Sequence, residues 1–396
     1  MSTTRSALSS RNYLTYLTGS TLSLLGLWIY RVALAWYAWE LSRSELWVGI
    51  VAATQFAPAV IFGPVFGVLA DRLDRKRTSI LINSLSSVNM VLLGALTAAG
   101  HIDIHSLVVL SLVQGVLDGG HAPVRMSIVP NLVAREQLQS AIALTSVAFN
   151  LSRFIGPAIA GVLIAAFGVA TAFVVNGVSY LALIGVMIVV NIRPRTRSER
   201  GRKHPWNELM DGARYAFSHR AIRGLLIVSA LASVCGRGAL EMLPVFADDI
   251  FSGGASALAI LTSAVGAGAV IGGLALSRGH DWLTTRIIRY ALSTAGILVI
   301  LLGVMPNFAG AVSVVALLGI TLSLCGIGAQ ILIQSLVDDE VRGRVSSFWG
   351  MIAFGGTSLG SLLVGTAASA WNLQSAVIAA GGICVLATWL SGRTRS

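Results

Sequence analysis

Long apolar runs separated by short polar segments make up most of this chain. Each run is close to the length of about 20 residues that a helix needs to cross the hydrocarbon core of a bilayer. We therefore expect an all-α membrane protein with twelve transmembrane helices. The runs lie at residues 14–40, 45–70, 78–99, 105–127, 139–166, 170–191, 221–247, 255–277, 286–305, 309–335, 345–369 and 373–391.

The composition supports this interpretation. The 396 residues are 55% hydrophobic and only 11% charged, whereas a soluble domain has about 25% charged residues. The net charge of +11 comes from basic residues that lie between the apolar runs, so we attribute it to membrane topology and expect no nucleic-acid partner. The expected partners are the lipid bilayer and a small-molecule substrate.

One polar segment sets the orientation of the chain. Asp71 to Arg77 holds six charges in seven residues, directly after an apolar run. We interpret it as a tight cytoplasmic hairpin between two spans, because Lys and Arg concentrate in cytoplasmic loops. This choice places both termini in the cytoplasm. Of the 28 basic residues, it leaves outside the cytoplasmic segments only Arg31, Arg43, Arg153 and Arg237.

The only long connection divides the chain into two pseudo-symmetric six-helix bundles, at residues 1–191 and 220–396. The linker, residues 192–219, begins with a basic segment. After Pro205, it places apolar residues on one helical face, which is typical of a helix lying on the inner leaflet. Two short matches between the halves indicate a repeat, the clearer being Arg31-Val-Ala33-Leu34 with Arg237-Gly-Ala239-Leu240.

Charges within the apolar runs are the first candidates for a substrate and proton cavity, because ionisable groups in a membrane must face a cavity or a partner. They are Arg31, Asp118, Arg153, Arg237 and Glu241. Arg237 and Glu241 are four residues apart on one helix, so they can pair directly. Glu241 is our candidate for ion coupling. The alternative is a fixed ion pair that only holds helices together.

Aromatic residues crowd the first span. Most of them, including Trp36 and Trp39, are expected to anchor the helix at the membrane interface. Trp28 and Tyr30 lie deeper, where their rings could stack on an aromatic or cationic substrate. We therefore add these two residues to the cavity.

The hairpin carries a recognisable motif. Gly67-x3-Asp71-Arg72-x2-Arg75-Lys76 resembles the loop motif of the major facilitator superfamily, although Asp74 stands where many members have Gly. The resemblance implies that Asp71 faces the start of span 11 and that Arg75 pairs with an acid. These contacts would hold an inner gate shut. The alternative is a basic loop that only anchors the chain.

Three further stretches resemble the subgroup of enterobactin, macrolide and drug exporters. They are residues 129–133 leading into 149–157, residues 206–215, and residues 339–345. This resemblance spans nearly the whole chain. It implies a secondary transporter in a bacterial inner membrane, whose substrate is a drug, macrolide or siderophore.

A second motif concerns the direction of transport. Gly156-Pro157-x2-Ala160-Gly161 resembles the antiporter motif of the superfamily, which goes with export. A proline bends a spanning helix and small residues let a partner pack on the bend, so an ordinary packing kink is the alternative. The motif expected in span 4 of proton-coupled exporters is half present, because Gln114 and Gly115 are there but Ser111 replaces its Arg.

No Walker A lysine and no catalytic constellation occurs, so we expect neither ATP hydrolysis nor an enzyme. We expect no metal and no cofactor, and an ion gradient, with protons as the first candidate, to drive export by a monomer. The alternatives are an uptake symporter and a membrane scaffold or sensor that transports nothing.

Overall fold

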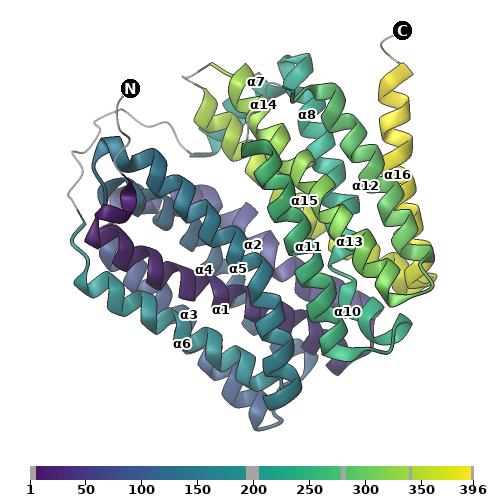
Figure 1. Ribbon diagram of the computed structural model, residues 1–396, viewed down its shortest axis with the longest axis horizontal. Helices are drawn as coiled ribbons and strands as arrows, with labels where there is room; N and C mark the ends of the chain where they lie inside the picture. Colours follow the sequence, from purple (N-terminus) through teal and green to yellow (C-terminus); the bar gives the residue numbers. More distant parts are fainter. Residues whose placement is uncertain (1–5, 193–204, 278–281, 339–340, 394–396) are drawn as a thin grey trace.

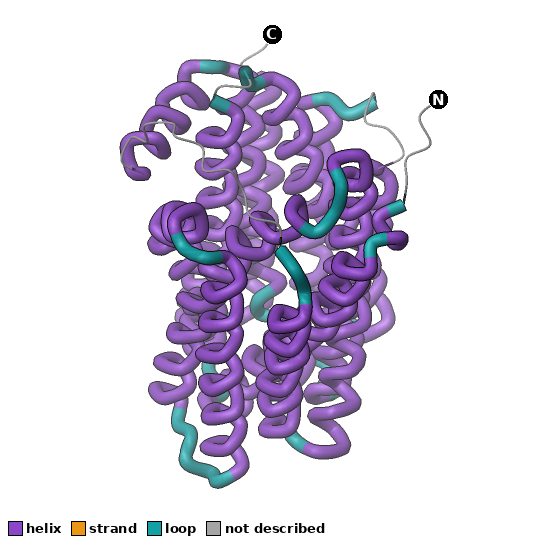
Figure 2. Tube along the Cα trace, turned by 90° about the vertical axis from the view of Figure 1, so that its left-hand side faces the viewer, coloured by secondary structure: helices purple, strands orange, loops and turns teal. Residues whose placement is uncertain are grey.

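The computed structural model describes residues 6–192, 205–277, 282–338 and 341–393. The side chains of residues 64, 65, 67–72, 122, 126, 127, 205–209 and 390–393 are outside this description. The described part is helical and contains no strand (Figure 2). Both termini lie at one end of the molecule, which we call the termini end, and we call the opposite end the distal end.

Helices α1 to α6 form one side of the molecule (Figure 1). Their contacts are mostly with one another, as in the pairs α3 with α6 and α2 with α4. In chain order they are α1 (Arg11–Ser42), α2 (Glu45–Arg72), α3 (Arg75–Ala98), α4 (Ile104–Ile128), α5 (Leu138–Phe167) and α6 (Val169–Val189). Short turns η1 (Ala7–Ser9), η2 (Val129–Asn131) and η3 (Arg135–Gln137) accompany them.

The remaining helices form the other side (Figure 1). A short amphipathic helix, α7 (Pro205–Ser218), comes first and packs on the start of α15. The rest are α8 (Arg220–Leu231), η4 (Ala232–Arg237), α9 (Gly238–Leu240), α10 (Leu243–Val245), η5 (Phe246–Ile250), α11 (Gly254–Ser277), α12 (Thr285–Val304), α13 (Phe308–Ser323), η6 (Leu324–Gly328), α14 (Ala329–Leu336), α15 (Arg342–Ala370) and α16 (Leu373–Arg393). The basic part of the linker, residues 193–204, lies outside the described residues.

Eleven helices in the described part of the chain are long and apolar enough to cross a membrane. They fall on the first eleven predicted runs. The twelfth predicted run corresponds to α16, whose apolar stretch, Leu373–Trp389, is shorter. The structure thus shows a polytopic helical membrane protein.

Two of the described spans contain π-helical segments, which the hydropathy pattern did not predict. The span Arg220–Ile250 contains the π-helical segments η4 and η5. The span Phe308–Leu336 contains a third, η6. A π-helical segment widens a turn and re-aims the side chains beyond it, and such segments often occur at functional sites.

The charged hairpin is as tight as its sequence predicts, with only Leu73 and Asp74 between α2 and α3. Asp74, which stands where many members of the family have Gly in this motif, has a structural role here. It is the N-cap of α3, and its side chain accepts a hydrogen bond of 2.8 Å from the backbone N–H of Arg77. Such a cap satisfies a helix donor that has no partner within the helix.

The two sides of the molecule touch through α2 and α15. The contacts run from the distal end, where the Ser361 hydroxyl donates to the Gly49 carbonyl at 3.2 Å, to the stacked rings of Phe56 and Phe354. Gly63, the next glycine along α2, faces open space. In the described residues, α2 and α15 are therefore closely packed over their distal halves.

Helices α5 and α11 make a similar contact. Ala259 of α11 lies against Gly161, and a side chain on Gly266 would meet the backbone oxygen of Arg153 at 2.7 Å. Small residues at such positions permit close approach of two backbones. Together, the two pairs close the distal end. We call this the distal-closed arrangement.

We predict that Gly49→Leu opens the distal end. A Cβ at this position would lie 2.5 Å from the Ser361 carbonyl oxygen, and such overpacking costs about 1–3 kcal/mol. Spin labels at His101 and Asn372, which are exposed in distal loops of the two sides, should move apart. Gly63→Leu on the same helix is the matched control and should leave their distance unchanged. An unchanged distance in Gly49→Leu would contradict the distal-closed arrangement.

Candidate functional site

Five charged residues from different helices converge near the middle of the molecule. They are Arg31 on α1, Asp118 on α4, Arg153 on α5, Arg237 at the end of η4 and Glu241 just after α9. Each side chain is partly buried. Arg31, Arg237 and Arg153 act electrostatically on Glu241, and Arg31 also acts on Asp118. We call these five residues the central charge cluster.

The predicted direct pair of Arg237 with Glu241 is wrong. Among the described residues, the ion pairs with an N–O distance of 4 Å or less are Arg43 with Asp248 and His105 with Asp103. The guanidinium of Arg237 instead lies beside Gly326 in η6, with Nη2 3.1 Å from where a Cβ would sit. The missing side chain at Gly326 leaves room for the cation at this place.

Trp28 lies between two of these cations. The guanidinium carbon of Arg31 is 4.9 Å from the centre of the indole ring, and that of Arg153 is 5.5 Å from it. Phe149 contacts the same ring edge-on, with 6.1 Å between ring centres. Aromatic faces attract cations, so the indole stabilises both arginines. The Trp28 Nε1 and the Arg31 Nε are buried without a hydrogen-bond partner.

Tyr30 packs toward α6, and Asp118 and Arg31 act on it electrostatically. It is only 1% exposed and packs on Phe173, with 6.1 Å between the ring centres. The structure thus buries Tyr30 between α1 and α6, while Trp28 lies beside the central charge cluster. Trp36 and Trp39 are also buried, at 9% and 5% exposure, which corrects their prediction as interfacial anchors.

Asp118 belongs to a hydrogen-bonded network on the first side. It accepts a hydrogen bond of 3.0 Å from the side-chain nitrogen of Gln114, which also donates to the Tyr180 hydroxyl. Asn89 of α3 donates to the Gln114 oxygen at 3.2 Å. Arg125, two helical turns beyond Asp118 on α4, acts on it electrostatically. Asp118 is therefore held by neutral partners and flanked by two arginines.

Sequence reasoning missed Arg125, which it counted among the cytoplasmic loop residues. Arg125 lines a small cavity of about 30 Å³ with Tyr16 and His121. The spacing from Asp118 to Arg125 is seven residues, which places both side chains on one helical face. This seven-residue spacing is the feature of the sequence by which Arg125 could have been found.

The gate motif is described only in part. The side chains of Gly67, Asp71 and Arg72 lie outside the described residues. No described acid forms an ion pair with Arg75 within 4 Å. The Lys76 ammonium donates to the carbonyl oxygens of Ile188 and Val190, at 2.8 and 3.2 Å. These lie at the end of α6, so Lys76 caps that helix.

The motif in α5 has two different packing faces. A Cβ at Gly156 would lie 2.5 Å from the Cβ of Trp28, so this glycine lets α1 approach α5 beside the central charge cluster. Gly161 instead meets Ala259 on the other side of the molecule. Pro157, buried between them, lies inside the helix. The motif therefore joins the cluster to the distal contact.

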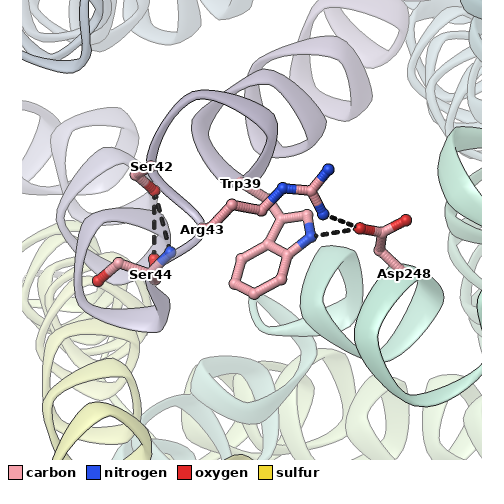
Figure 3. Close-up of polar contacts among 5 residues, drawn as sticks. All are labelled: Trp39, Ser42, Arg43, Ser44 and Asp248. Carbon is pink, nitrogen blue, oxygen red and sulfur yellow. Dashed lines mark hydrogen bonds and ion pairs between the residues drawn. The ribbon is translucent and has the colours of Figure 1, made fainter.

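The distal end carries one more contact, which we call the distal latch (Figure 3). Arg43 and Trp39 of α1 both bind one carboxylate oxygen of Asp248 in η5, the indole nitrogen at 2.9 Å. Arg43 has a left-handed backbone, with φ of 47°, which is uncommon for a residue other than glycine. Sequence reasoning did not pair these residues, because 205 positions separate Arg43 from Asp248.

A pocket of about 570 Å³ lies at the distal end between the two sides. Trp36, Tyr37 and Glu40 line it from α1, and Gly253 to Ser256 line it from the start of α11. It is large enough for a small molecule.

The fold and the central charges define a membrane transporter of the major facilitator type. Solved structures agree with this fold. A bacterial homologue of the lysosomal transporter Spinster has a TM-score of 0.75 at 16% identity, covering 96% of each chain. The nucleoside transporter NupG has a TM-score of 0.74 at 13% identity, covering 96% of this chain and 98% of that one.

The chain belongs to the transmembrane secretion effector family, whose model matches residues 2–395. Its relatives include the staphyloferrin A transporter of Staphylococcus aureus, which is 26% identical over 90% of each chain. Macrolide efflux protein A of Streptococcus pyogenes is 23% identical over 84% of each chain. The enterobactin exporter of Escherichia coli is 24% identical over 87% of this chain and 82% of its own. The protein is thus a transporter and not an enzyme.

We predict that the distal latch stabilises the distal-closed arrangement by a small amount. The Arg43 side chain is 59% exposed and that of Asp248 is 22% exposed, and exposed ion pairs contribute at most about 1 kcal/mol. Asp248→Asn should therefore shift the spin-label distance between His101 and Asn372 toward the open population by about fivefold or less. The charge swap Arg43→Asp with Asp248→Arg restores the ion pair but removes the carboxylate that Trp39 binds, so it should return the distribution part of the way to the original. A swap that behaves like the single variant would exclude the ion pair as the cause.

Proposed function

We propose that this protein exports an amphipathic small molecule from the cytoplasm by alternating access, in exchange for protons. Twelve spans in two six-helix halves, with both termini in the cytoplasm, would form the transporter. The observation that carries the proposal is the central charge cluster, in which charged residues of α1, α4 and α5 and of the span Arg220–Ile250 act on one another electrostatically. Ionisable groups in such a position usually mark a substrate or ion pathway.

The direction of transport is supported by the relatives. Two of them are named for efflux or export, of macrolides and of enterobactin. Drugs, macrolides and siderophores are therefore the candidate substrates. The distal-closed arrangement is the state in which an exporter would load its substrate from the termini end.

Glu241 is the proposed coupling residue. Three arginines act on its carboxylate and none pairs with it within 4 Å. Gain or loss of one proton there changes the charge that faces the substrate by one unit. Breaking the distal latch would accompany the change of state, and the gate at the Asp71 loop would close at the termini end.

We predict that cells expressing the protein accumulate less of a labelled substrate than cells without it. The assay uses a panel of dyes, antibiotics and siderophores in an exporter-deficient host. Glu241→Gln should raise accumulation to the level of the empty host, and the matched control Glu136→Gln, at an exposed position, should not. A protonophore should have the same effect as Glu241→Gln.

Two ionophores separate the contributions of the pH difference and of the membrane potential to export. Nigericin removes the pH difference and valinomycin with potassium removes the membrane potential. Export that survives in Glu241→Gln would keep the exporter and exclude this coupling residue. Higher accumulation in the expressing cells would indicate uptake, and no difference across the whole panel would favour a scaffold or sensor.

A further inference from the structure

We propose that the central charge cluster binds an amphipathic anion with two acidic groups, such as a dicarboxylate attached to an apolar ring system. This inference rests on the proposed transport function and names the class of molecule transported. The charged residues at the centre of the molecule do not balance one another. Asp118 and Arg125, both on α4, interact electrostatically. Arg31 acts on both Asp118 and Glu241, and Arg153 and Arg237 act on Glu241. Together with Arg125, these arginines are four cations facing two acids, so two positive charges remain uncompensated.

Two donors of this site have no hydrogen-bond acceptor among the described residues. None of Arg31, Arg153 and Arg237 forms an ion pair with a described acid within 4 Å. The Arg31 Nε and the Trp28 Nε1 are buried and unpartnered. Both atoms can only donate, so an acceptor must come from a bound molecule or from a rearrangement. Buried polar groups in native proteins are nearly always hydrogen-bonded, and an exception points to a missing partner.

Apolar rings border the cations from both sides of the molecule. Arg31 is 5.3 Å from the ring of Phe56 on α2, and Phe56 stacks on Phe354 of α15 with 6.5 Å between ring centres. Trp28 and Phe149 add the rings of α1 and α5. A ligand here meets flat apolar faces and planar guanidinium groups together. Guanidinium groups bind carboxylates through two parallel hydrogen bonds.

The charge of the ligand follows from these contacts. A dianion brings the sum of charges around Glu241 to zero. A cationic amine of the same shape would add a third uncompensated positive charge in a partly desolvated site, where like charges repel strongly. The site should therefore select by the sign of the charge and tolerate variation in the apolar part.

The test uses two dyes with the same xanthene ring system and opposite charge. Carboxyfluorescein is an anion with two or more negative charges, and tetramethylrhodamine ethyl ester is a cation. We would measure fluorescence polarisation of each dye with the purified full-length protein in lipid nanodiscs. Carboxyfluorescein should bind at least about tenfold more tightly than the cation. Isophthalate should compete with it, and dimethyl isophthalate, which has no charge, should not.

Substitutions test whether carboxyfluorescein binds at the central charge cluster. Arg153→Gln and Arg237→Gln should each weaken carboxyfluorescein binding by about tenfold or more, as expected when a hydrogen bond to a charged group is lost. Arg220→Gln removes the same charge at an exposed position and should have no effect. Trp28→Phe keeps an aromatic face but loses the N–H, so it should weaken binding less than loss of an arginine.

Two results would overturn the inference. One is tighter binding of the cation than of the anion. The other is anion binding that is absent, or that Arg153→Gln and Arg237→Gln leave unchanged. The accumulation assay is independent of these outcomes. If the cells export a cationic dye, the protein is still an exporter and only the anionic substrate class fails.

Discussion

Arginines in the middle of a membrane protein that form no ion pair with a described acid are the constraint on which the rest of this structure depends. Placing an arginine at the centre of a bilayer costs about 2.5–3.5 kcal/mol even on the most lenient scale. Trp28 offsets part of that free energy, because it faces both Arg31 and Arg153. A cation over an aromatic face gains about 0.5–2 kcal/mol. The rest requires water, a carboxylate or a ligand, so the helices must keep the site reachable.

The same two spans carry both the central charge cluster and the distal latch. On α1, Arg31 and Arg43 are twelve residues apart, or about 18 Å along the helix. On the opposing span, Glu241 and Asp248 are seven residues apart. A movement of α1 against that span therefore changes both places together. Gly161 adds a second connection, because α5 carries Arg153 at the cluster and meets Ala259 toward the distal end. Neutralisation at the centre can thus reach the distal contact through α1 and α5.

The sequence alone predicted what depends on local pattern. Hydropathy located the spans because a bilayer demands long apolar helices, and the charged hairpin is tight because Asp74 caps α3. The five cluster residues were found because charges in apolar runs are rare. The π-helical segments could not be predicted, since they arise where helices pack. The same holds for the place of the Arg237 guanidinium beside Gly326, almost ninety residues away, and for Arg43 with Asp248, which only folding brings together.

The charge of the substrate bears on the source of energy. With a dianion bound and Glu241 ionised, the charges around the site cancel, so the loaded complex needs no proton. Moving a charge across the membrane potential is worth about 2.3 kcal/mol per 100 mV, and two negative charges leaving a negative interior gain about twice that. A proton carried inward in exchange would add a third charge in the same electrical direction. Protonation of Glu241 would then matter chiefly after the substrate has left, when the empty site returns to the cytoplasmic side. In the empty site, protonation raises the number of uncompensated positive charges from two to three. Export of an anionic substrate would therefore draw more of its driving force from the membrane potential than from the pH difference. Export of a cationic substrate would have to rely on the pH difference.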